Sequence, residues 1–215
     1  MELTPDAVAA ALHLIGFGWV AWLGRRMRAA GATLSAPRRR AIALFGIAWL
    51  VLFASSAAFH LAPPGPWREA LALADDGAIV LAIAAAWTPL GPFRLSPDEA
   101  RRCLAAIWSL ALVLLVLTAW AARDDAARRA LSWGYLAHAL APGVLYGRTI
   151  LSGFSRSLLG LLFASTLFYG GGLMLYLRPD LVWAHAGWHA AVLAGCLCNH
   201  AALARLIAAA RQEPA

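Results

Sequence analysis

Long apolar runs separated by short polar segments extend along the whole chain. Seven of them approach the roughly 20 residues that a helix needs to cross a bilayer. They cover residues 8–24, 41–62, 77–93, 103–122, 130–151, 157–177 and 184–209. The third run is short and contains Pro89 and Pro92, which make its lower end the least regular. The pattern predicts an all-α integral membrane protein, a seven-transmembrane helix bundle in a single domain over residues 1–215, with six or eight helices as alternatives.

The composition leads to the same class of protein. Of the 215 residues, 62% are hydrophobic and only 13% are charged. A soluble domain of this size has too little interior to bury so much apolar surface, whereas a bilayer accommodates it.

The basic residues act as topology signals. The net charge is +7, every basic residue is an arginine, and most of the arginines flank predicted helix ends. The first loop is the most basic and contains Arg25, Arg26, Arg28, Arg38, Arg39 and Arg40. The positive-inside rule then predicts an extracytoplasmic N-terminus and a cytoplasmic C-terminus. Since the arginines have this role, no nucleic-acid partner is expected. The oligomeric state does not follow from the sequence.

Histidines at the ends of two apolar runs are the main candidates for function. His185 and His189 are four residues apart, so on a helix both imidazoles project from one face and can bind one metal ion. His60 ends another run. In an up-down bundle, the end of the second helix and the starts of the third and seventh lie at the same membrane face. His60, Asp75, His185 and His189 are therefore expected to share one site.

Three imidazoles with an open fourth position are typical of a catalytic zinc site. Zinc lowers the pKa of a bound water to roughly 7. Asp75 is placed to accept the proton of that water, and Ser56, one turn before His60, could orient the water or donate to a developing oxyanion. This set of groups suits hydrolysis of an ester or amide, and its position at the membrane boundary indicates a lipid substrate.

Simpler interpretations compete for each residue. His185 and His189 could be interfacial residues without a ligand, Asp75 could only cap a helix, and Ser56 could bond to a carbonyl of its own helix. The other polar residues in or beside the helices are expected to have packing, capping or solvated roles: His13, Asp76, His138 and His200.

Two further functions remain open at this stage. In the first, zinc ties the second and seventh helices together without catalysis. In the second, the histidines bind a b-type haem, although an i, i+4 pair directs both rings at one small ion and suits haem poorly.

Several motifs, in order, resemble the hemolysin III and progestin/adiponectin-receptor family, whose wider superfamily includes the alkaline ceramidases. They are Ser56-x-x-x-His60, Asp75-Asp76-Gly77-Ala78-Ile79, Ala86-Trp87-Thr88-Pro89, Phe168-Tyr169 with Gly172, and His185-x-x-x-His189. The segment His13-Leu14-Ile15-Gly16 also resembles the first helix of hemolysin III proteins.

The resemblance implies a seven-helix bundle in the bacterial inner or plasma membrane, with Zn²⁺ as cofactor. The implied ligands are His60, His185 and His189. The acid on the zinc-bound water is Asp75, because the family's Asp-x-x-x-Ile fits residues 75–79, with Asp76 as the alternative. The implied activity is ceramidase-like hydrolysis of a lipid amide or ester. The alternative is a non-enzymatic, receptor-like or membrane-lysing protein with a structural zinc.

The chain departs from the family pattern in two respects. Asn199 stands where hemolysin III members often have a histidine. The receptor members have a cytoplasmic N-terminus, which is opposite to the orientation that the arginines indicate. The arginine distribution predicts that the site faces the extracytoplasmic side, whereas the topology of the receptor members implies the opposite face.

Overall fold

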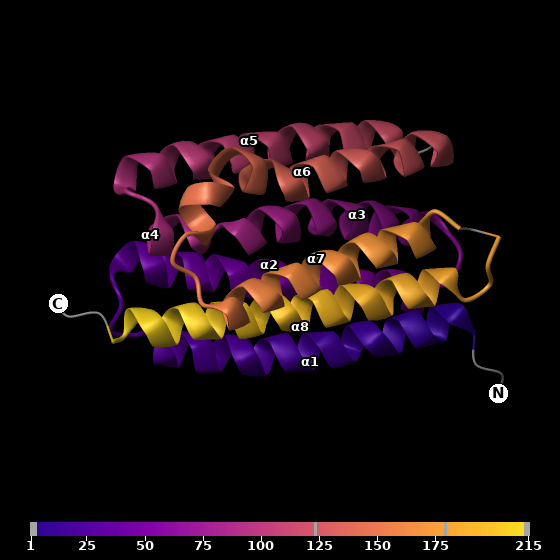
Figure 1. The fold of residues 1–215 in the computed structure, drawn as a ribbon. Coiled ribbons are helices and arrows are strands. Elements are labelled where there is room, and N and C mark those ends of the chain that lie inside the picture. The colour runs from indigo at the N-terminus through magenta and orange to yellow at the C-terminus, as the bar shows by residue number, and fades with distance from the viewer. Residues whose placement is uncertain (1–3, 123, 179, 213–215) are drawn as a thin grey trace.

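Long helices lie side by side in the computed structural model, which describes residues 4–122, 124–178 and 180–212 (Figure 1). The helices are α1 (Pro5–Ala30), α2 (Ala36–Leu61), α3 (Pro66–Trp87), α4 (Leu90–Arg94), α5 (Pro97–Ala121), α6 (Asp125–Leu151), α7 (Arg156–Tyr176) and α8 (Ala184–Ala210). The described residues contain no strand. The all-α prediction is therefore confirmed.

Six segments of the described chain are long and apolar enough to cross a membrane. Five of them are α1, α2, α5, α7 and α8. The sixth spans α3 and α4 as one segment. The multi-pass prediction is thus confirmed for six spans. The predicted seventh span, α6, has 27 residues and lies beside α5 (Figure 1), but it falls outside this group because its sequence is more polar.

The predicted start of the third helix is wrong. The structure begins α3 at Pro66, directly after Gly65 with φ +148°, instead of at residue 77. The first turns of α3 carry Arg68 and Glu69, so hydropathy alone missed them. Asp75 consequently lies inside the helix, and the interpretation of Asp75 as a helix cap is also wrong. At its other end, α3 stops at Trp87, and the short helix α4 begins at Leu90.

The helices that carry the candidate residues are neighbours. Helix α1 packs against α2 and α8, and α3 packs against the other side of α2. Figure 1 shows that the start of α1, the α2–α3 link and the α7–α8 link lie at the same end of the bundle. This arrangement confirms the expectation that the end of α2 and the start of α8 share one face, and it adds the start of α1.

Glycines allow α7 and α8 to pack closely. A Cβ atom at Gly195 would lie 2.5 Å from the ring of Tyr169, and one at Gly172 would lie 2.8 Å from Ala191 and Trp188. Real Cβ contacts do not reach such distances, so both positions require a residue without a side chain.

We expect Gly195→Ala to destabilise the protein by about 1–3 kcal/mol, because the added methyl group forces the Tyr169 ring to move. Thermal unfolding in detergent measures the effect. Gly170→Ala is the matched control, since a Cβ there has nothing within 4 Å. Equal melting temperatures for the two variants would contradict the predicted close contact.

A charged pair joins α3 to α6. Arg128 donates from Nη2 and Nε to Asp76 Oδ2 over 2.7 and 2.9 Å, and both side chains are largely buried. Asp76 is therefore neither a helix cap nor a freely solvated acid, which corrects both sequence interpretations. The pair attaches α6, the most polar of the long helices, to the helix that carries Asp75.

Candidate metal centre

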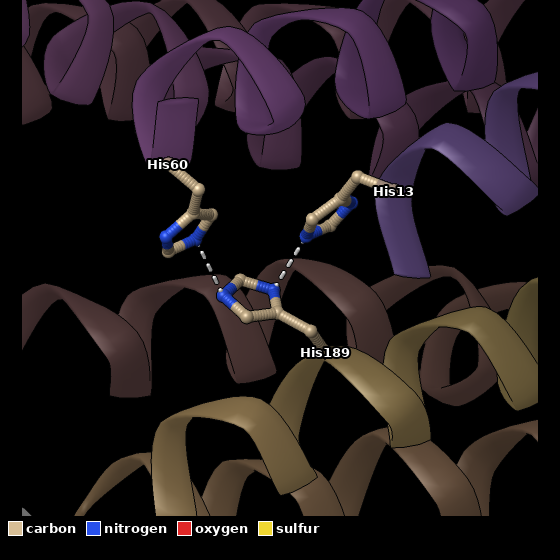
Figure 2. A group of neighbouring side chains, drawn as sticks. All are labelled: His13, His60 and His189. Carbon is tan, nitrogen blue, oxygen red and sulfur yellow. Dashed lines mark hydrogen bonds between the residues drawn. The ribbon is translucent and has the colours of Figure 1, made fainter. Parts of the chain in front are cut away.

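Four histidines from three helices gather at the end of the bundle where α1 and α8 begin. His13 comes from α1, His60 from the last turn of α2, and His185 and His189 from the first turns of α8. His13, His60 and His189 are buried, and His185 is half-buried. Figure 2 shows the three buried rings turned toward one another across the helix interfaces.

His189 is the centre of this cluster. Its Nε2 lies 2.9 Å from His60 Nε2 and 2.9 Å from His185 Nε2. Its other nitrogen, Nδ1, lies 2.7 Å from His13 Nε2. His13, His60 and His189 each offer one ring nitrogen, and these nitrogens lie within 4.8 Å of one another. The three buried histidines are therefore positioned as a possible metal site.

The donor set fits a metal ion. A neutral imidazole carries one N–H and one lone pair. The Nε2 atoms of His60 and His185 both face the single Nε2 of His189, so one proton on that atom cannot satisfy both contacts. A cation that accepts lone pairs satisfies all three nitrogens, and imidazole nitrogen is a preferred ligand of zinc.

Ser56 and Asp75 adjoin the histidines. Ser56 donates from Oγ to Asp75 Oδ2 over 3.1 Å, and the same Oγ lies 2.8 Å from His13 Nε2. Ser56 is 1% exposed and Asp75 8% exposed. Asp75 Oδ1 is also buried and has no hydrogen-bond partner in the described part of the chain. A buried carboxylate oxygen without a partner is available to a proton donor such as water.

The role expected for His13 was wrong. The sequence suggested a packing residue, whereas the structure places His13 against His189 and Ser56. The available signal was the His-x-x-Gly segment. Gly16 lets α1 approach α2 closely, since a Cβ there would lie 2.6 Å from the Phe53 ring. Nothing in the spacing of one helix shows which neighbouring helix its histidine reaches.

The two other histidines, His138 and His200, each bond one backbone carbonyl, and their second ring nitrogens have no partner among the described residues. A packing role for them stays a prediction. His138 Nε2 donates to the carbonyl of Ile107 over 3.2 Å, and His200 Nδ1 donates to the carbonyl of Cys196 over 2.9 Å. Both rings are buried away from the cluster. They provide matched controls for substitutions within it.

Comparison with known proteins identifies the family of this chain. The family model described as haemolysin-III related matches residues 1–200. The chain belongs to the haemolysin-III-related family. Within this family, the chain is 30% identical over 159 residues to the Hemolysin-3 homolog of Bacillus subtilis (strain 168). The aligned region covers 71% of this chain and 70% of that protein. The family resemblance inferred from the ordered motifs is therefore confirmed.

Proposed function

We propose that this haemolysin-III-related protein is a zinc-dependent hydrolase of a lipid amide or ester. His60, His185 and His189 hold the zinc, and the observation that carries the proposal is that the Nε2 atoms of His60 and His185 each lie 2.9 Å from Nε2 of His189. Three protein ligands leave a fourth position for water, which is the arrangement of catalytic zinc sites.

The two nitrogens of His189 separate two ligand sets. His60 faces Nε2, whereas His13 faces Nδ1 on the other side of the ring (Figure 2). His185 also faces Nε2. One imidazole binds a given ion through one nitrogen, so His13 and His185 are alternatives as ligands with His189. We favour His185, because the Nδ1–H of His189 can then donate a hydrogen bond to His13 Nε2, which leaves the lone pair of His189 Nε2 for the metal.

Bound zinc would supply a water that ionises near neutral pH. Asp75 would act as the proton acceptor on Oδ1, the buried oxygen that has no hydrogen-bond partner among the described residues. Ser56 fixes the orientation of the carboxyl group by donating to Oδ2. The burial of both side chains excludes bulk water from the reacting groups.

The surroundings of the site favour a lipid substrate. Large apolar side chains are exposed at this end of the bundle, with Trp67 82% exposed and Trp183 52% exposed. Tryptophans at helix ends are typical of the membrane–water boundary. A substrate with an apolar chain and a polar amide or ester would approach the histidines from this boundary. We place the protein in the bacterial inner or plasma membrane.

A non-enzymatic role is the second candidate, and the burial of the histidine cluster favours it. His13, His60 and His189 are at most 6% exposed, which leaves a substrate little direct access to them. In this alternative the metal would only tie α1, α2 and α8 together, in line with the haemolysin name of the Bacillus relative.

Turnover decides between the two candidates. The zinc-loaded, full-length protein in lipid nanodiscs is incubated with a panel of lipid amides and esters, and release of fatty acid is followed by mass spectrometry. We expect release from at least one substrate, and no release above background from the His185→Ala/His189→Ala variant. A zinc-bound protein that cleaves nothing in the panel would favour the structural role.

A further inference from the structure

We infer that Asp6, held in place by Arg68, is a positioning residue that orients His60 toward the metal. The inference rests on the proposed function, since it assigns a role within that same centre. Asp6 Oδ1 lies 2.9 Å from His60 Nδ1. The His60 side chain is completely buried, whereas Asp6 is 48% exposed, so this acid approaches the ring from the surface of the bundle.

The contact determines which nitrogen of His60 carries the proton. A carboxylate only accepts hydrogen bonds, so His60 Nδ1 must donate to Asp6. In a neutral ring, Nε2 then has a free lone pair, and this is the atom that faces His189. A carboxylate on the distant nitrogen of a metal-bound histidine is a recurrent arrangement that fixes the ring and makes it a better donor.

Arg68 holds Asp6 in this position. It donates from Nη2 to Asp6 Oδ2 over 2.8 Å and from Nη1 to the carbonyl of Ala62 over 2.7 Å. Its guanidinium also lies 4.8 Å from the centre of the Phe59 ring. The start of α1 is thereby joined to the end of α2 and the start of α3. An acid in the first turn also favours its own helix, but that role requires neither His60 nor Arg68.

Metal affinity tests the inference. Zinc binding to the full-length protein in detergent is measured by competition with a chelator of known affinity. We expect Asp6→Asn to bind zinc about 10–100-fold more weakly than the wild type, and Asp6→Glu, which keeps the carboxylate, to recover most of the affinity. Asp180→Asn is the control, because it also removes a charge paired with an arginine, Arg178, on the α7–α8 link.

Cobalt substitution separates positioning from folding. The d–d absorption bands of bound Co²⁺ depend on the donor strength of its ligands. We expect these bands to shift in Asp6→Asn and to stay unchanged in Asp180→Asn. A change that only reduced the folded fraction would lower the band intensity without moving the bands.

The outcomes distinguish this inference from the proposed function. A wild-type protein that binds neither zinc nor Co²⁺ would overturn both. If the wild type binds metal and Asp6→Asn shows the same zinc affinity and the same Co²⁺ spectrum, only the role of Asp6 is overturned. If Asp6→Asn does not fold, Arg68→Gln decides: weaker zinc binding supports the inference, and wild-type affinity overturns it.

Discussion

The His185→Ala/His189→Ala double variant is expected to lose its zinc, while the wild type retains close to one zinc per chain. The substitution removes two of the three imidazoles whose Nε2 atoms converge, and the one remaining nitrogen cannot hold the ion. Elemental mass spectrometry of protein purified without chelators measures the zinc content. His138→Gln is the matched control, because it replaces a buried histidine that bonds a backbone carbonyl outside the cluster.

Single variants then identify the third ligand. With His185 as the ligand, His185→Ala loses zinc, and His13→Ala still binds one zinc when the metal is in excess. The reverse pattern would assign the ion to the three buried histidines His13, His60 and His189. A wild type purified without any zinc would contradict the hydrolase mechanism altogether.

Replacing Asp75 by Asn is expected to lower turnover by about 10²–10⁴-fold, since the amide cannot accept the proton from water. Zinc content should be unchanged, because no contact joins Asp75 directly to a histidine nitrogen; Ser56 lies between Asp75 and His13. Fatty-acid release from the lipid substrate and zinc content are measured on the same preparation.

Asp76→Asn is the control for this experiment. Asp76 is adjacent in sequence but pairs with Arg128 instead of Ser56. Its substitution should lower the melting temperature and leave turnover close to that of the wild type. Wild-type turnover in Asp75→Asn, together with loss in Asp76→Asn, would transfer the role of the base to Asp76.

The fold class could be predicted from the sequence because a bilayer imposes a simple requirement on length and apolarity. Because successive helices of an up-down bundle run in opposite directions, the end of the second helix and the start of the last helix could be predicted to lie at the same membrane face. The start of α3 could not be predicted in this way. Its first three turns, residues 66–76, lie before the apolar run and depend on Gly65 and Pro66 instead of hydropathy.

The candidate site could be predicted only in part, for a related reason. His60, His185 and His189 are recognisable because they end apolar runs or share a helix face at a metal-binding spacing. His13 and Asp6 lack such a local pattern. Their positions depend on how closely α1 approaches α2 and α8, and that contact is set by residues such as Gly16, which lies against Phe53.

The pair between Asp76 and Arg128 also has a consequence for biogenesis. If α6 forms the seventh span that the sequence predicts, its transfer from the translocon into lipid would be the least favourable step of assembly, because α6 is the most polar of the long helices. Asp76 of the earlier-synthesised α3 would then neutralise Arg128 as α6 enters the bilayer. Helix α6 is therefore expected to enter the membrane as the partner of a preassembled α3–α5 unit, so that a fault in α3 appears first as a failure of α6 to insert.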